Sequence, residues 1–161
     1  MMIAPYIKLV FAFTLLLTST LSYGDKVVHR EKSLYQNIVI SEEAGKRCLV
    51  FSVKRQQRNQ TCIDINDPSH IVFPYVRMTF AGLLVNPKPS RGLTIGMGGG
   101  TISSVLTSIY PDLTLDLVEV DQAVVNVATD YFGFKKTDQI DVHVTDGRVF
   151  ARRALSRKEQ Y

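Results

Sequence analysis

The sequence predicts an α/β protein in which an antiparallel β-meander precedes a partial parallel sheet of the order βαβαβα. Up to residue 66, short segments rich in branched and aromatic residues alternate with polar turns, as in a meander. From residue 93 on, strand-like and helix-like segments alternate, which is typical of a parallel sheet with right-handed crossovers. With 161 residues, 45% of them hydrophobic and 21% charged, the chain has the length and composition of one globular domain.

Residues 1–24 have the layout of a secretory signal peptide. They contain Lys8 and no acidic residue, an apolar run over 9–17, and the small residues Ser22 and Gly24 before the expected cleavage point. The apolar run is too short for a comfortable membrane span. We therefore expect a periplasmic or secreted protein. The alternatives are an uncleaved membrane anchor and a cytoplasmic protein with a misassigned start codon.

The β-meander is expected over residues 25–66. Its strand-like segments are 33–40, 47–53 and 60–65. Cys48 and Cys62 fall on neighbouring segments, and an even number of cysteines in an exported chain permits one disulfide. A register centred on the polar turn 54–59 places the two cysteines a few residues out of line. A disulfide and two buried free thiols are therefore both open.

Residues 67–92 are expected to form a helix and a linker. The apolar stretch 73–85 can be helical if Pro74 stands in its first turn, where its missing N–H costs no hydrogen bond. Pro87 and Pro89 then mark the linker.

Residues 93–161 are expected to form the partial parallel sheet. Asp121 is suited to N-cap the middle helix, and Gly133 to end it. The expected strands are 93–95, 113–120 and 140–144, and the expected helices are 99–110, 121–132 and 148–158.

The first strand of this sheet is followed by Gly96, Gly98 and Gly100. Glycines at this place let the backbone turn tightly and approach a ligand at the N-terminus of the next helix. The spacing is G-x-G-x-G, whereas the dinucleotide form G-x-G-x-x-G/A needs a small residue at position 101, where this chain has Thr101. The spacing therefore favours a Rossmann-like domain for a ligand of the S-adenosylmethionine type over one for NAD.

Two carboxylates follow later strands of the sheet. Glu119 stands 23 residues after Gly96, where an acid can hold the two hydroxyls of a ribose. Asp146 follows the third strand, where it can accept a hydrogen bond from an adenine amino group. The alternative is that Asp146 and Gly147 form an ordinary turn in which Asp146 caps the last helix.

Charge and histidine spacing argue against two other kinds of site. Without the predicted signal peptide the net charge is +3, and the basic clusters at 54–58 and 148–158 fit a hairpin tip and a solvated helix face. His29, His70 and His143 share no metal-ligand spacing. We therefore expect no nucleic-acid partner and no metal.

From about Ser33 to its end, the chain resembles the spermidine synthase-like family, the polyamine aminopropyltransferases. The motifs that carry the resemblance are Leu34-Tyr35-Gln36-Asn37-Ile38, Gln60-Thr61, Asp67-Pro68, Phe73-Pro74-Tyr75, 95–101, Tyr110-Pro111-Asp112, Val118-Glu119-Val120-Asp121, Tyr131-Phe132-Gly133-Phe134 and Asp146-Gly147-Arg148. Because they span nearly the whole mature chain in the family's order, they are much more specific than the glycines alone.

The resemblance implies a β-meander followed by an S-adenosylmethionine-type domain that binds decarboxylated S-adenosylmethionine and uses no metal. In the family an aspartate deprotonates an amine such as putrescine, the amine attacks the carbon next to the sulfonium, and methylthioadenosine leaves. Carried over by position, Gln60, Glu119 and Asp146 contact the nucleoside, and Tyr75 contacts the amine.

Three departures from the family pattern weaken the expectation of an enzyme. The family usually has an aspartate at the position of Gly99, where it holds the aminopropyl ammonium, and a polar residue at the position of Val76. The family's catalytic base lies on the strand after the last helix, about where this sequence ends at Tyr161. We therefore expect a truncated chain that is inactive alone and whose unpaired strand 93–95 favours self-association. The alternatives are an S-adenosylmethionine-dependent methyltransferase and a non-catalytic exported nucleoside-binding module.

Overall fold

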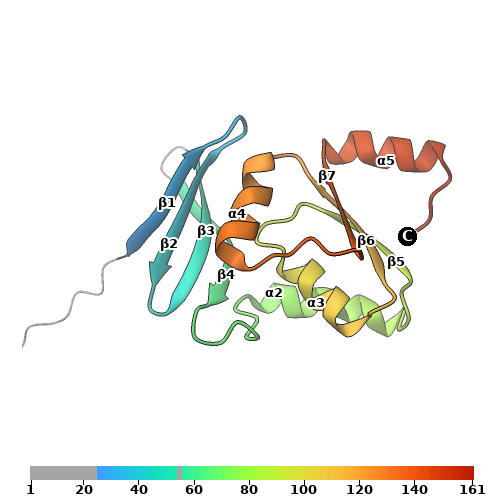
Figure 1. The fold of residues 1–161 in the computed structure, drawn as a ribbon, viewed down its shortest axis with the longest axis horizontal. Helices are drawn as coiled ribbons and strands as arrows, with labels where there is room; N and C mark the ends of the chain where they lie inside the picture. The colour runs from blue at the N-terminus through green and yellow to red at the C-terminus, as the bar shows by residue number, and fades with distance from the viewer. Residues whose placement is uncertain (1–24, 54–55) are drawn as a thin grey trace, which may run out of the picture.

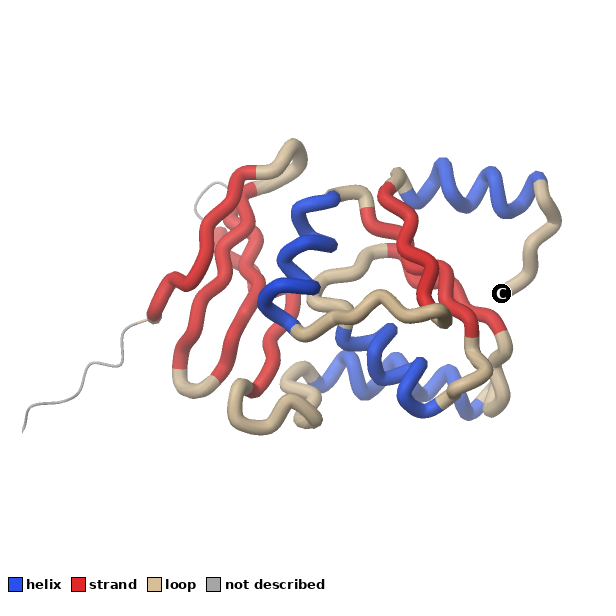
Figure 2. The backbone as a smooth tube through the Cα atoms, in the orientation of Figure 1, coloured by secondary structure: helices blue, strands red, loops and turns tan. Residues whose placement is uncertain are grey.

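The computed structural model of the chain describes residues 25–53 and 56–161. The predicted signal peptide, residues 1–24, lies outside the described residues. Figures 1 and 2 show a four-stranded sheet at one end of the molecule and a three-stranded sheet with its helices at the other. No described helix has both the length and the apolar character needed to cross a membrane.

The order of the elements confirms the predicted fold class. The N-terminal elements are the strands β1 Lys26–Lys32, β2 Asn37–Glu43, β3 Lys46–Val53 and β4 Gln56–Asp64, the helix α2 Pro74–Thr79 and the 3-10 helix η1 Phe80–Leu84. The C-terminal elements are β5 Arg91–Ile95, α3 Thr101–Ile109, β6 Thr114–Glu119, α4 Gln122–Phe132, β7 Ile140–Val144 and α5 Gly147–Ser156. β1 to β4 form an antiparallel sheet in chain order, and β5 to β7 form a parallel sheet.

The meander differs from its prediction in three places. It has four strands rather than three. The additional strand is the charged edge strand β1, which was not predicted because it lacks the apolar pattern of a half-buried strand. The predicted strand 33–40 begins only at Asn37, since the preceding residues form a turn in which the Ser33 N–H donates to the Gln36 carbonyl at 2.9 Å. Of the predicted turn 54–59, residues 56–59 belong instead to β4, and residues 54 and 55 lie outside the described residues.

A β-bulge in β4 brings the two cysteines into line. Leu49 pairs with Thr61 whereas Val50 pairs with Asn59, so Gln60 is an extra residue of β4. Cys48 therefore lies directly opposite Cys62, with the Cα atoms 4.1 Å apart, and the two form a disulfide. Of the two alternatives that the sequence left open, the structure has the disulfide.

The helix α4 joins the meander to the parallel sheet. Ile38 and Leu49 of the meander pack in one buried cluster with Val124 and Val127 of α4. Figure 1 shows α4 lying between the two sheets. The sequence signals for its ends are correct, since the Asp121 carboxylate caps the helix and Gly133 ends it with a φ of 71°.

Side chains of the central strand β6 alternate between the two faces of the parallel sheet. Leu115 and Leu117 pack with Ala128 of α4 on one face. Val118 points to the opposite face and packs with Phe150 of α5. Helices therefore cover both faces of the strand. Ligands of such sheets bind at the carboxyl edge, which the helices do not cover.

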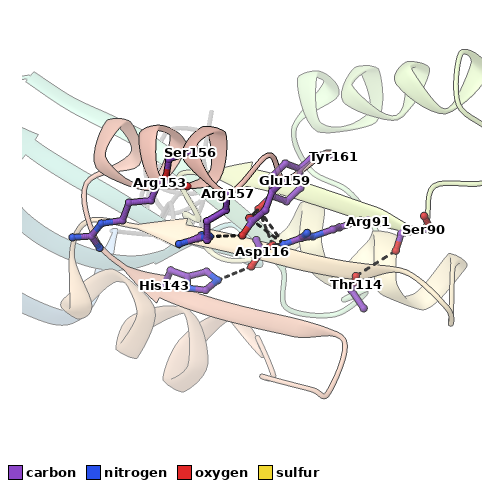
Figure 3. Close-up of polar contacts among 10 residues, drawn as sticks. All are labelled: Ser90, Arg91, Thr114, Asp116, His143, Arg153, Ser156, Arg157, Glu159 and Tyr161. Atoms are coloured by element: carbon purple, nitrogen blue, oxygen red, sulfur yellow. Dashed lines mark hydrogen bonds and ion pairs between the residues drawn. The ribbon is translucent and has the colours of Figure 1, made fainter.

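The face covered by α5 also carries a polar cluster around Asp116, which Figure 3 shows. Arg91 donates to Asp116 at 2.8 Å, the Tyr161 hydroxyl donates at 3.0 Å, and His143 Nε2 lies 2.6 Å from the carboxylate. Burial alone raises the pKa of Asp116, but the hydrogen bonds from Arg91, His143 and Tyr161 together hold that pKa below its ordinary value. Burial and hydrogen bonds to Glu159 and Asp116 raise the pKa of the Tyr161 hydroxyl.

Candidate functional site

A cavity of about 340 Å³ opens between the carboxyl edge of the parallel sheet and the meander. Five of the residues predicted to form the site line it: Gln60, Tyr75, Gly96, Gly98 and Glu119. Gln60 comes from β4, Tyr75 from α2, the glycines from the loop after β5, and Glu119 from the end of β6. The volume is within the range of small-molecule pockets. The fold thus brings these five residues, which are up to 59 positions apart, to one place.

The Glu119 carboxylate is held by three backbone N–H groups. The Met97 N–H donates to Oε2 at 3.0 Å, and the N–H groups of Val120 and Asp121 donate to Oε1 at 2.8 Å and 3.1 Å. Glu119 is only 9% exposed. Because a carboxylate offers about four lone-pair sites, the backbone leaves room for roughly one further donor such as a ribose hydroxyl.

The glycine loop has the backbone that its sequence predicts. Gly96 and Gly98 have φ values of 88° and 56°, in the region that favours glycine. Gly100, with a φ of 78°, is the N-cap of α3 and is not among the residues lining the cavity. A Cβ on Gly100 would lie 2.5 Å from Cδ2 of Phe134. Packing and backbone conformation therefore account for this third glycine without a ligand.

Close packing also leaves no room for a side chain at Gly99. A Cβ there would lie 2.5 Å from Cγ2 of Thr61 and 3.2 Å from the ring of Phe132. The side chains of Thr61 and Phe132 therefore fill the space that an aspartate at this position would need.

Gln60 and Tyr75 are connected through the bulge in β4. The Tyr75 hydroxyl donates to the Gln60 carbonyl at 3.3 Å, and Gln60 Nε2 donates to the Arg58 carbonyl at 3.1 Å. The Tyr75 ring stacks on Phe73 with the centroids 5.7 Å apart. Bulges occur beside functional sites, and Gln60, the extra residue of this bulge, lines the cavity.

Asp146 lines a second cavity, of about 580 Å³, which shares Gly96 and Glu119 with the first. Its Oδ1 accepts hydrogen bonds from the N–H groups of Arg148 and Val149, so Asp146 caps α5 as the alternative interpretation predicted. These bonds, the one from Val149 first, hold the pKa of Asp146 below its ordinary value. The cap uses Oδ1, and Oδ2 lies 3.5 Å from Nη2 of the exposed Arg148, so a ligand amino group would share Oδ2 with that guanidinium.

Several lining residues were not predicted from the sequence. Thr61 and Met97 line the first cavity, and Tyr35 lines the second. Thr61 follows Gln60 in the chain, so the motif that contains both could have indicated it. The position of Tyr35 depends on where the turn before β2 lies against the parallel sheet, which no local pattern encodes.

Few charged side chains line the two cavities. Within residues 25–53 and 56–161, the charged lining residues are Glu119, Asp146 and the exposed Arg148. The described residues contain no cluster of three His, Cys, Asp or Glu side chains that could hold a metal ion. The site is thus equipped to accept hydrogen bonds from hydroxyl and amino groups and to enclose an apolar body.

The fold and the cavities define an α/β protein with a glycine-loop site at the carboxyl edge of a parallel sheet. The chain is 46% identical over 158 residues to a polyamine aminopropyltransferase of Vibrio vulnificus, an alignment that covers 96% of this chain and 52% of that protein. It is 34% identical over 88 residues to the human eEF1A lysine and N-terminal methyltransferase, covering 50% of this chain and 13% of that protein. No protein-family model matches.

A solved structure of a spermidine synthase in complex with the transition-state analogue AdoDATO has the same fold. The TM-score is 0.59 at 25% sequence identity, over 80% of this chain and 43% of that one. The resemblance to the spermidine synthase-like family is confirmed, and the chain is a relative of the polyamine aminopropyltransferases. It spans about half the length of the Vibrio vulnificus relative.

Proposed function

We propose that this chain binds the adenosine part of a co-substrate of the S-adenosylmethionine type in these two neighbouring cavities, and so serves spermidine synthase-like aminopropyl transfer. The observation that carries the proposal is the convergence of Gln60, Gly96, Gly98 and Glu119 on one cavity, which shares Gly96 and Glu119 with the cavity that Asp146 lines. The relationship to a polyamine aminopropyltransferase along 96% of this chain supports the same conclusion.

In the proposed complex each polar residue has one task. Glu119 accepts a hydrogen bond from a ribose hydroxyl, and Oδ2 of Asp146, which does not cap α5, accepts one from the adenine amino group. Gln60 contacts the nucleoside from the meander side, and Tyr75 stands at the amine end. The co-substrate is decarboxylated S-adenosylmethionine, and the acceptor is a polyamine such as putrescine.

The carboxylates of the described cavities suit binding better than proton removal. Glu119 accepts three backbone hydrogen bonds and Asp146 accepts two. Hydrogen bonds to the charged form of Asp146 hold its pKa below the ordinary value, so Asp146 is a weaker base. We therefore propose that residues 25–161 bind nucleoside but do not transfer the aminopropyl group by themselves.

A methyltransferase is the second candidate function. It is supported by the 34% identity to the human methyltransferase over half of this chain, and by Gly99, which offers no carboxylate to a cationic aminopropyl tail. A methyltransferase should bind S-adenosylmethionine more tightly than its decarboxylated form, and an aminopropyltransferase the reverse. The order of the two affinities therefore distinguishes the two candidates.

Calorimetric titration tests the binding proposal. Methylthioadenosine, S-adenosylmethionine and its decarboxylated form are each titrated into the chain. We expect saturable binding of methylthioadenosine and of the decarboxylated form. Absence of binding by all three nucleosides would refute the proposed function and leave an interaction module without a nucleoside site.

We also propose that the protein is exported to the periplasm or secreted. The Cys48–Cys62 disulfide supports this location, since disulfides persist in oxidising compartments. The intact mass of the protein recovered from a periplasmic fraction should correspond to a chain that begins near Asp25 with both cysteines bonded. A mature chain that retains Met1 would contradict cleavage.

Self-association is proposed from the sheet order. In the described residues β5 lies at one edge of the parallel sheet, and Ile95 at its end is 59% exposed. An unpaired apolar edge can pair with another chain. Light scattering across a concentration series should show a mass above that of the monomer, and a monomer at every concentration would contradict the proposal.

A further inference from the structure

We propose that Tyr35 supplies an aromatic wall on which the nucleobase stacks; this inference rests on the proposed function. Tyr35 lies outside the parallel sheet, in the turn between β1 and β2, yet it lines the same cavity as Glu119 and Asp146. Tyr35 is 60% exposed, so much of its surface is accessible to a ligand.

The turn that carries Tyr35 is fixed to the carboxyl edge of the parallel sheet. The Ser33 hydroxyl donates to the Asp121 carboxylate at 2.5 Å, and Asp121 lies two residues after Glu119. The same hydroxyl accepts hydrogen bonds from the N–H groups of Tyr35 and Gln36, both at 3.1 Å. Because Asp121 is buried and also caps α4, the turn has a rigid attachment beside the proposed ribose site.

The remainder of this cavity suits a flat, largely apolar group with one polar edge. Ile95, Val118 and Ala151 contribute apolar lining, and Asp146 contributes the carboxylate that would meet an exocyclic amino group. Aromatic rings stack on any nucleobase through their faces, and the hydrogen bond from the amino group then favours a base with an exocyclic amino group, such as adenine. The ring of Tyr35 and the carboxylate of Asp146 thus divide recognition of the base between stacking and hydrogen bonding.

The test compares three variants of the full chain by calorimetric titration with methylthioadenosine. We expect Tyr35→Ala to weaken binding about tenfold or more, as loss of a base–aromatic stack does. Tyr35→Phe keeps the ring and should stay within about twofold of the unmodified chain. Leu34→Ala is the matched control, because Leu34 is 99% exposed in the same turn and does not line this cavity.

A second readout reports the stack itself. Bound adenine should move the NMR signals of the Tyr35 ring protons through its ring current, and the melting temperatures of the variants should match that of the unmodified chain. If the unmodified chain binds methylthioadenosine and Tyr35→Ala binds it equally well, the inference is wrong while the proposed function stands. If the unmodified chain does not bind, the inference and the proposed function both fail.

Discussion

Glu119 accepts a hydrogen bond from the backbone N–H of Met97 at 3.0 Å, so the acid at the end of β6 is tied directly to the glycine loop after β5. This hydrogen bond therefore fixes Glu119 and the glycine loop relative to each other, and both contact the nucleoside in the proposed complex. A change at Glu119 acts on the loop as well as on the ligand, and stability and affinity must be measured together.

Replacement of Glu119 should reduce both properties. In Glu119→Gln the amide offers one acceptor oxygen where the carboxylate offers two, so at least one backbone N–H loses its partner. We expect a loss of about 1–3 kcal/mol in the free energy of unfolding and at least about tenfold weaker methylthioadenosine binding. Urea unfolding and calorimetry measure the two effects. Glu43→Gln, at the exposed end of β2, is the control and should change neither.

The packing at Gly99 predicts a double-mutant effect. Gly99→Ala should destabilise the chain by about 1–3 kcal/mol, because the new methyl group would meet the Thr61 methyl at 2.5 Å. Thr61→Ser removes that methyl group, so the combined variant should recover part of the loss. Thermal unfolding provides the measurement. Gly82→Ala is the control, since a Cβ there meets no atom within 4 Å, and an equal loss at Gly82 would contradict the packing explanation.

Local sequence signals located the parts of the site that lie on one supersecondary unit. The glycine spacing, the acid at the end of the second strand and the caps Asp121 and Gly133 are all short-range patterns with a stated backbone consequence. The parallel sheet and its helices therefore lie close to their predicted bounds.

Features that depend on packing between distant segments could not be predicted from local sequence patterns. The bulge at Gln60 is set by pairing with β3, and it shifts the register by one residue, which decides whether Cys48 meets Cys62. The contact of Thr61 with Gly99 joins the meander to the glycine loop. Neither relationship has a local pattern, since the first depends on the pairing of two strands of the meander and the second on the contact of the meander with the glycine loop.

The disulfide should stabilise the meander. Cys48 and Cys62 are 14 residues apart, and a crosslink closing a loop of this size typically contributes about 3 kcal/mol through the unfolded chain. The double variant Cys48→Ala, Cys62→Ala should unfold at a lower urea concentration. A reductant should destabilise the unmodified chain and leave the double variant unaffected. Equal stability of the two proteins without reductant would contradict the prediction.

The cluster at Asp116 predicts a loss of stability in acid. The folded-state pKa of Asp116 is below its ordinary value, so its contribution is fully present above about pH 4 and is lost as the pH falls through the folded-state pKa. Asp116→Asn should cost about 1–3 kcal/mol at pH 7, because three donors surround this carboxylate. Urea unfolding between pH 7 and pH 2 should show a smaller acid loss in the variant. The same pH dependence in both proteins would exclude Asp116 as a cause.

The proposed nucleoside site is tested most directly by calorimetric titration of the unmodified chain with methylthioadenosine and with its 2′,3′-dideoxy analogue. The two ligands share the base and the thioether, and they differ only in the two ribose hydroxyls, one of which Glu119 is proposed to bind. We predict saturable binding of methylthioadenosine and at least about tenfold weaker binding of the dideoxy analogue, since a hydrogen bond to a charged group contributes about 1.5–3 kcal/mol. Equal affinities for the two ligands, or no binding of either, would contradict a ribose site at Glu119.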